Sequence, residues 1–150
     1  MMKQTLVLCG LAVFMAVRVA AVDAVTPWLT DLPQAKEQAK KENKRVLINF
    51  TGSDWCSWCI KIKKEILDTK EFKAYAAKNL VLVELDFPNR KAQSPQLKKA
   101  NAALQDEFSV GGFPTFVVLG SNGKEVGRQV GYLKGGVSAF TGKIDGFAAK

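Results

Sequence analysis

Two cysteines separated by two residues are the part of this sequence best suited to chemistry. Cys56 and Cys59 stand in the motif Trp-Cys-Ser-Trp-Cys, after the apolar run 46–50 and before a stretch with helical spacing. This order of strand, short loop and helix places a thiol pair on the first turn of a helix. Such a pair is typical of a centre that alternates between dithiol and disulfide.

The positions of the two thiols predict different roles for them. Cys56 lies at the predicted start of the helix, where unpaired N–H groups and the helix dipole favour an anion, and disulfide exchange needs a thiolate. Cys59 lies on the same face, within disulfide reach. We therefore predict that Cys56 attacks and that Cys59 resolves the mixed disulfide. Lys61, Lys63 and Lys64 either add a positive field or form an ordinary solvated helix face.

The composition excludes most other chemistry. The chain has no histidine, so histidine-dependent catalysis and histidine-ligated zinc, copper or haem are not available. Two cysteines do not complete a structural zinc site, and an iron–sulfur cluster would need ligands from other chains. We expect no cofactor and no bound metal. A copper-handling thiol pair is a minor alternative.

The first 24 residues have the pattern of a secretory signal peptide. An apolar stretch over 5–17 follows a lysine and is too short for a membrane span of about 20 residues. Small residues then allow cleavage after Ala24 or Ala21. We predict a signal peptide at 1–24 and one domain at 25–150, in a periplasmic or secreted protein; an uncleaved anchor is the alternative. Export would place the cysteines where disulfides persist.

The chain is basic, with a formal net charge of +8. A solvated basic surface is the simplest interpretation, and acidic partners or anionic surfaces are the alternative. No basic motif interleaved with aromatic residues suggests nucleic-acid binding. After removal of the leader we expect no stable membrane span and a monomer whose partners are proteins.

The elements that must position the thiols alternate between helices and strands. Predicted helices cover 34–43, 56–68, 71–78, 96–107 and 137–149. Predicted strands cover 46–50, 80–85, 115–119 and 124–132. Asp31 is the predicted cap of the first helix, and Asn122-Gly123 marks a hairpin turn. The order predicts an α/β fold with a central mixed sheet, parallel strands plus a C-terminal hairpin, and helices on both faces.

Residues 27–149 resemble the thioredoxin superfamily. The resemblance rests on Trp55 with Cys56 and Cys59 after an apolar strand, and on Gly-Phe-Pro-Thr at 112–115 before a strand and hairpin. Within the superfamily the chain is similar to bacterial exported thioredoxin-like proteins. It is also similar to the C-terminal domain of thiol:disulfide interchange reductases. The dipeptide between the cysteines is Ser-Trp, so the redox potential of thioredoxin does not carry over.

The resemblance implies a second wall of the site. Pro114 is expected to be cis and to lie against the cysteine pair, with the backbone of Phe113 pairing with an extended substrate segment. The ordinary alternative for an isolated Phe-Pro is a trans proline at a strand entry. Trp58 is either an exposed contact for partners or packs against the preceding loop. The candidate substrate-binding residues are Trp55, Trp58, Phe113 and Pro114.

The sequence departs from the family pattern beneath the motif. Thioredoxins bury an aspartate there, which takes the proton of the resolving cysteine. Asn49 falls at that position, and an amide cannot accept a proton. The family's lysine partner is expected at Leu82, so proton transfer from Cys59 must use water, Glu84 or another group. Asp54 is predicted to cap a loop, or else to oppose ionisation of the attacking thiol.

Two functions from different classes fit these observations. The first is an exported thiol–disulfide oxidoreductase that exchanges disulfides with protein dithiols through Cys56 and Cys59. Its direction, as reductase or oxidase, depends on its potential and on a redox partner protein. The second is a thioredoxin-fold binding module with little redox turnover, which the missing aspartate at Asn49 and the aromatic Trp58 motivate.

Overall fold

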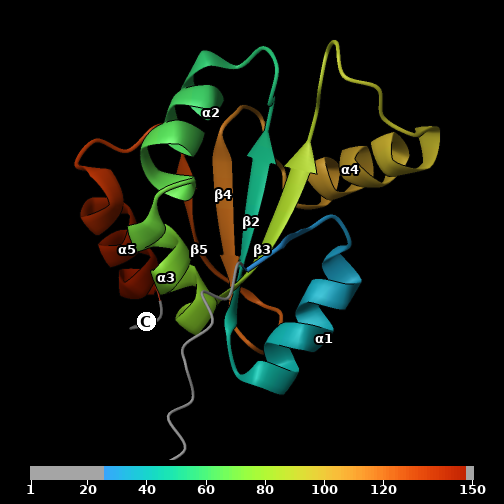
Figure 1. Ribbon diagram of the computed structural model, residues 1–150. Helices are drawn as coiled ribbons and strands as arrows, with labels where there is room; N and C mark the ends of the chain where they lie inside the picture. The colour runs from blue at the N-terminus through green and yellow to red at the C-terminus, as the bar shows by residue number, and fades with distance from the viewer. Residues whose placement is uncertain (1–25, 148–150) are drawn as a thin grey trace, which may run out of the picture.

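A five-stranded mixed sheet organises the computed structural model, which describes residues 26–147 (Figure 1). The strands lie in the order β1-β3-β2-β4-β5. The strands are β1 (Trp28–Leu29), β2 (Arg45–Thr51), β3 (Leu80–Asp86), β4 (Thr115–Leu119) and β5 (Glu125–Val130). β1, β3 and β2 run parallel, whereas β4 and β5 form an antiparallel hairpin beside β2. The predicted fold class is confirmed.

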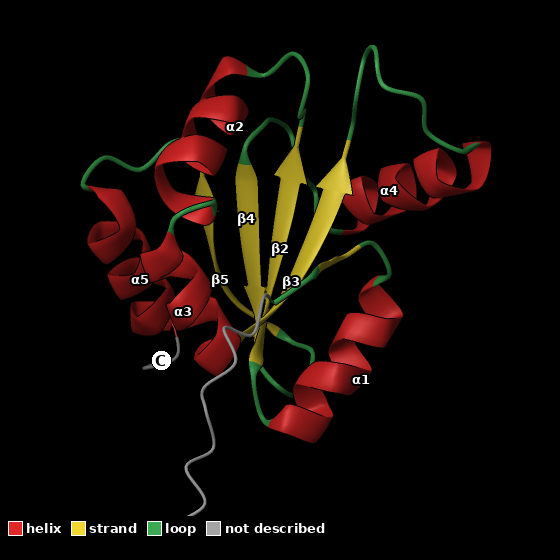
Figure 2. Ribbon diagram, in the orientation of Figure 1, coloured by secondary structure: helices red, strands yellow, loops and turns green. Residues whose placement is uncertain are grey.

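Helices cover both faces of the sheet (Figure 2). One face carries α1 (Leu32–Glu42) and α4 (Pro95–Glu107). The other face carries α2 (Ser57–Ile62), the π-helical turn η1 (Lys63–Leu67), α3 (Lys70–Asn79) and α5 (Gly136–Phe147). No helix within residues 26–147 combines the length and apolar character that crossing a bilayer requires.

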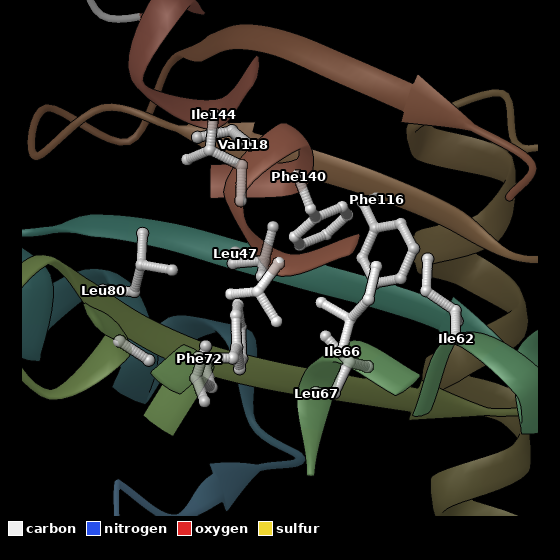
Figure 3. Close-up of a cluster of buried hydrophobic side chains, with 13 residues drawn as sticks. Leu47, Ile62, Ile66, Leu67, Phe72, Leu80, Phe116, Val118, Phe140 and Ile144 are labelled. Carbon is white, nitrogen blue, oxygen red and sulfur yellow. The ribbon is translucent and has the colours of Figure 1, made fainter. Parts of the chain in front are cut away.

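The side chains of β2 divide between two hydrophobic clusters, because successive strand residues point to opposite faces. Leu47 joins the cluster under α2, η1, α3 and α5, where Phe116 and Phe140 pack at 5.0 Å between ring centroids (Figure 3). Ile48 and Phe50 join the cluster under α1. A strand that is buried on both faces has a nearly continuous apolar sequence. This explains why apolar and polar residues do not alternate along β2.

Two local predictions are confirmed by backbone geometry. The N–H of Gln34 donates to Asp31 Oδ1 at 2.7 Å, so Asp31 caps α1 as expected. Gly123 has φ +77° in the turn between β4 and β5, the left-handed conformation that glycine adopts without strain. Asn122 Oδ1 accepts from the N–H of Lys124 at 3.0 Å and closes that turn.

The structure differs from the predictions at β1, at the helix after the motif and at the end of the last strand, and most other bounds shift by one or two residues. β1 was not predicted, because two half-buried residues carry no periodic signal. The single helix predicted over 56–68 divides into α2 and η1, where the N–H of Asp68 reaches the carbonyl of Lys63 at 2.9 Å. The last strand ends at Val130, before the predicted 132. The predicted leader and the end of the last helix lie outside the described residues.

Arg45 joins the start of β2 to the last helix. Its guanidinium donates to the carbonyl oxygen of Ile144 and to the carboxylate of Asp145, both at 2.7 Å, and to the hydroxyl of Tyr75 at 3.2 Å. The Tyr75 hydroxyl in turn donates to Asp145 at 2.6 Å. Burial, together with this bond, raises the pKa of Tyr75 to about 12, so the phenol remains a donor.

We predict that Arg45→Met lowers the free energy of unfolding by about 1–3 kcal/mol, because three acceptors lose a charged donor. Urea denaturation of the purified protein measures the change. The matched control is Lys40→Met on the exposed side of α1, which should change stability by less than about 0.5 kcal/mol. Equal midpoints for the two variants would show that the Arg45 contacts contribute nothing to stability.

Candidate active site

Four chain segments meet at one edge of the sheet. β3 is parallel to β2 and pairs Asp86 with Thr51, whereas β4 is antiparallel and pairs Thr115 with Phe50. Val130, the last residue of β5, pairs with Thr115. The loops after β2 and β3, the loop before β4 and the loop after β5 therefore all leave from the same edge (Figure 1). The predicted site residues lie in these loops and in the first turn of α2, which follows the loop after β2.

The cysteine pair forms the centre of this edge. Cys56 and Cys59 are joined by a disulfide, with their Cα atoms 5.2 Å apart, so the predicted disulfide reach is confirmed. Cys56 is the N-cap of α2, and its Sγ accepts from the N–H of Cys59 at 3.2 Å. Cys59 and Ile62, one turn apart, both point into the buried side of the helix. On reduction, the N-cap position favours a thiolate on Cys56.

The loop before β4 is held rigidly beside β5. The Phe113–Pro114 peptide bond is cis, as predicted. The N–H of Gly131 donates to the carbonyl of Pro114 at 2.8 Å, and Thr115 Oγ1 donates to the carbonyl of Gly112, also at 2.8 Å. Pro114 and Thr115 are buried, whereas Gly112 is exposed.

Three aromatic rings line one side of the site. The Trp55 indole N–H donates to the carbonyl of Phe87 at 2.7 Å. The ring of Phe113 stacks on Phe87 at 4.9 Å and meets Trp55 edge-on at 5.9 Å. A Cβ at Gly52 would stand 2.5 Å from the Trp55 ring, so glycine is needed there. The sequence prediction missed Phe87, although its place directly after a strand at this edge was a signal.

Trp58 lies on the other side of the site and packs against the loop after β5. Its ring centroid is 5.4 Å from that of Tyr132, so its aromatic neighbour lies in the loop after β5 and not in the preceding loop, which was one of the two alternatives. The Lys61 ammonium lies 5.5 Å from the Trp58 centroid and 5.1 Å from the Tyr132 centroid. The Tyr132 hydroxyl donates to Glu65 at 2.6 Å. Trp58 keeps 53% of its surface exposed, as the partner-contact prediction requires.

Asp54 organises the loop after β3. Its carboxylate accepts from three successive backbone N–H groups of residues 89–91, at 2.8–2.9 Å. These bonds, that of Asn89 foremost, lower the pKa of Asp54 to about 2. The loop-capping prediction is therefore confirmed. Ser53 binds the end of β3, since its N–H and hydroxyl donate to the Asp86 carboxylate at 2.9 and 2.5 Å.

A buried amide lies under the motif helix. Asn49 is 3% exposed, and its Oδ1 has no hydrogen-bond partner among the described residues. Its register partner on β3 is Glu84 and not Leu82, so the expectation for the paired position was wrong. Leu47 and Leu82 belong to the cluster under α2 and η1. Asn49 and Glu84, two residues further along each strand, therefore share that face.

Glu84 combines partial burial with nearby charges of both signs. Burial raises the pKa of its carboxyl, and the carboxylates of Asp86 and Asp68 act in the same direction. Lys63 and Lys91 lower it by a smaller amount. Lys63 is itself paired with Asp68 at 2.5 Å. The site thus holds a carboxyl on the strand next to Asn49, and it belongs to Glu84, one of the alternatives that the sequence offered for the Cys59 proton.

Known proteins share this arrangement in sequence. Residues 32–139 match the thioredoxin-like domain family. The disulfide bond reductase DsbH of Chlamydia pneumoniae is 39% identical over 111 residues, covering 74% of this chain and 66% of that protein. The thioredoxin-related protein DsbJ of the same organism is 30% identical over 101 residues, covering 67% of this chain and 29% of that protein. The chain therefore spans about two thirds of DsbH and under a third of DsbJ.

Solved structures show the same fold. The structure of the DsbH oxidoreductase superposes with a TM-score of 0.76 at 34% identity, covering 93% of this chain and 94% of that one. The oxidised C-terminal domain of Neisseria meningitidis DsbD superposes with a TM-score of 0.57 at 21% identity, covering 80% of this chain and 98% of that domain. The second likeness concerns the fold alone.

We predict that Glu84→Gln stabilises the oxidised protein at neutral pH. Burial raises the pKa of Glu84 above the ordinary value of 4.5. Ionisation of this carboxyl therefore lowers the free energy of unfolding as pH rises above that value. The variant should therefore unfold at higher urea than the wild type at neutral pH, and the difference should vanish below that value.

Urea titrations across this pH range measure the effect. The control is Glu37→Gln on the exposed side of α1, where the same substitution removes no buried carboxylate. A destabilised Glu84→Gln protein at neutral pH would contradict the assigned cost of burying this carboxylate.

Proposed function

The chain belongs to the thioredoxin-like family, and on that premise we propose that it is an exported thiol–disulfide oxidoreductase with Cys56 and Cys59 as its redox pair. The observation that carries the proposal is the disulfide at the helix start, with Cys56 Sγ at the N-cap. Similarity to DsbH, a disulfide bond reductase, supports the same chemistry and favours the reducing direction. A redox partner protein would then supply the electrons.

In the reducing direction the reaction has two exchange steps. The Cys56 thiolate attacks one sulfur of a client disulfide, and the other client sulfur leaves as a thiolate and takes a proton from solvent. The Cys59 thiol then loses its proton and attacks the Cys56 sulfur. This closes the disulfide and releases the second client thiolate. Two electrons pass from the protein to the client, and the reverse sequence would oxidise a client.

Glu84 is the proposed acceptor of the Cys59 proton. Cys59 is 3% exposed, so bulk water has little access to it, and Asn49 cannot accept a proton. Glu84 lies on the same sheet face, under the helix that carries Cys59, and burial raises its pKa, which strengthens it as a base. Once protonated, its O–H is a donor beside the unpartnered Asn49 Oδ1.

The edge around Cys56 is the proposed client site. Trp55 and Trp58 are exposed there and offer apolar contact area. An extended client segment would pair with the backbone of Phe113, beside Pro114. The leader at 1–24 supports export to the periplasm or beyond the cell, with a monomeric domain at 25–150 as the working protein.

A binding module with little turnover is the second candidate. The exposed Trp55 and Trp58, together with the amide at Asn49, favour it. A binding module predicts that a Cys56→Ser, Cys59→Ser double variant keeps both its partner and its cellular role. The oxidoreductase predicts that this double variant loses them.

We predict that Cys56→Ser abolishes reduction of insulin disulfides, because the attacking thiolate is lost. Cys59→Ser should instead accumulate mixed disulfides with clients, since the second step cannot occur. Turbidity of insulin and non-reducing gels with mass spectrometry measure the two outcomes. Ser121→Ala, in the hairpin turn at the opposite end of the sheet, is the control with unchanged turnover. Normal turnover by the Cys56→Ser protein would refute the proposal.

We predict that Glu84→Gln slows the second exchange step. Reduced protein is mixed with dithiobis-nitrobenzoate, which releases one coloured thiolate as Cys56 attacks and another as Cys59 closes the disulfide. The second release should slow by about 10-fold or more near neutral pH and recover at alkaline pH, where hydroxide can take the Cys59 proton directly.

The first release, which reports Cys56, should be unchanged by this substitution, and Glu37→Gln should leave both phases unchanged. An unaltered second phase in Glu84→Gln across the whole pH range would remove Glu84 from the mechanism.

A further inference from the structure

The most exposed large apolar side chains among residues 26–147 gather around the redox site. They are Trp55, Trp58, Ile60 and Val130, which are 46%, 53%, 48% and 65% exposed. Trp55, Trp58 and Ile60 lie in the segment 55–60, which contains both cysteines. Val130 pairs with Thr115, the residue that follows the cis proline. Apolar surface concentrated in this way marks a binding face.

One half of this face is also cationic. The Lys61 ammonium lies over the Trp58 and Tyr132 rings, and its nearest carboxylate, on Glu65, is 4.0 Å away. The second oxygen of that carboxylate accepts from the Tyr132 hydroxyl at 2.6 Å. Glu65 is thus held by the tyrosine and pairs only loosely with the ammonium. The Lys61 ammonium is therefore a half-exposed cation whose N–H groups are free to donate to a ligand.

Two further lysines extend the positive charge. Lys64 lies about one turn after Lys61 on the same helical segment, and Lys134 follows Tyr132 by two residues in the loop after β5. Both are exposed, and within the described part of the chain neither forms an ion pair. The aromatic surface therefore has a cationic rim without a compensating free carboxylate.

Local geometry keeps this surface in place. Trp58, Lys61 and Glu65 are spaced by three and then four residues along α2 and η1, so they form one ridge. Tyr132 is anchored to that ridge by its hydroxyl, and the preceding Gly131 is anchored to Pro114. The cationic rim and the proline loop are therefore parts of one continuous face around Cys56.

We propose that the surface formed by Trp58, Lys61 and Tyr132 selects extended protein segments that carry a carboxylate side chain close to the cysteine that Cys56 attacks. The rings contact the segment, and the Lys61 ammonium binds the acidic side chain. A basic side chain at the same place is repelled by Lys61, Lys64 and Lys134. The inference rests on the proposed function and adds the class of client to it.

The test uses peptides with a single cysteine held as a mixed disulfide with nitrothiobenzoate. The three peptides differ at one residue beside the cysteine, which is Glu, Gln or Lys. The Cys56 thiolate attacks the peptide sulfur, forms a disulfide with it and expels coloured nitrothiobenzoate with the electron pair. A Cys59→Ser background stops the reaction there. The leaving group is the same in all three peptides, so its charge cancels in the comparison.

The Glu peptide should react about 10-fold faster than the Lys peptide at low salt, and the gap should shrink as salt rises toward ~1 M. Lys61→Gln should reduce this ratio at least about threefold, and Lys61→Glu should reverse it. Lys40→Glu, which makes the same charge change on the exposed side of α1, should leave the ratio unchanged.

A small mixed disulfide of mercaptoethanol and nitrothiobenzoate, whose only charge is the carboxylate of the shared leaving group, reports the reactivity of Cys56 without a peptide and normalises every variant. Equal normalised rates for the three peptides, or the same ratio in Lys61→Glu as in Lys40→Glu, would overturn the proposed selectivity. The Trp58 and Tyr132 rings would then bind the peptide with no contribution from the Lys61 charge. Failure of the proposed function is distinguishable, because Cys56 would then react with neither the peptides nor the small mixed disulfide, and insulin turnover would be absent.

Discussion

The register of β2 against both of its neighbours is the constraint on which the rest of the structure depends. β2 is paired on both edges and buried on both faces, and Val46, Leu47 and Ile48 are fully buried. A slip by one residue would turn Asn49 into the opposite cluster and an apolar side chain toward the motif helix. The same register sets Asp86 and Thr115 beside the end of β2, so it also determines where the other loops of the site begin.

This geometry gives the two sulfurs unequal surroundings. Cys56 caps the helix at the edge of the sheet, where the proposed client site lies and where backbone N–H groups stabilise a thiolate. Cys59 points toward the face that contains Asn49 and Glu84. A buried amide oxygen without a hydrogen-bond donor destabilises the fold by about 1–3 kcal/mol. A proton that reaches this place during the cycle would give the Asn49 oxygen a donor and would lower that cost. In the proposed mechanism, Glu84 is the group that carries this proton.

Local signals in the sequence were sufficient for much of the fold. The strand Thr115–Leu119 was predicted with its observed bounds, since a proline precedes it and a hairpin turn follows. The disulfide and the cis proline followed from the motif and from the resemblance. β1 was missed because its two residues are a strand only by pairing with β3.

The missed parts of the site depend on contacts between distant segments. Leu82 was expected opposite Asn49, but the partner is Glu84, because register is set by the whole sheet and no local pattern reveals it. Tyr132 belongs to the site because the loop after β5 packs on Trp58, a contact that no local sequence pattern predicts. These contacts also suit the chemistry. An exchange enzyme must release each client, so a small exposed aromatic face with a cationic rim can speed association through charge while the limited contact area keeps dissociation fast. A larger apolar groove would bind the client more tightly and would delay its release after the second exchange step.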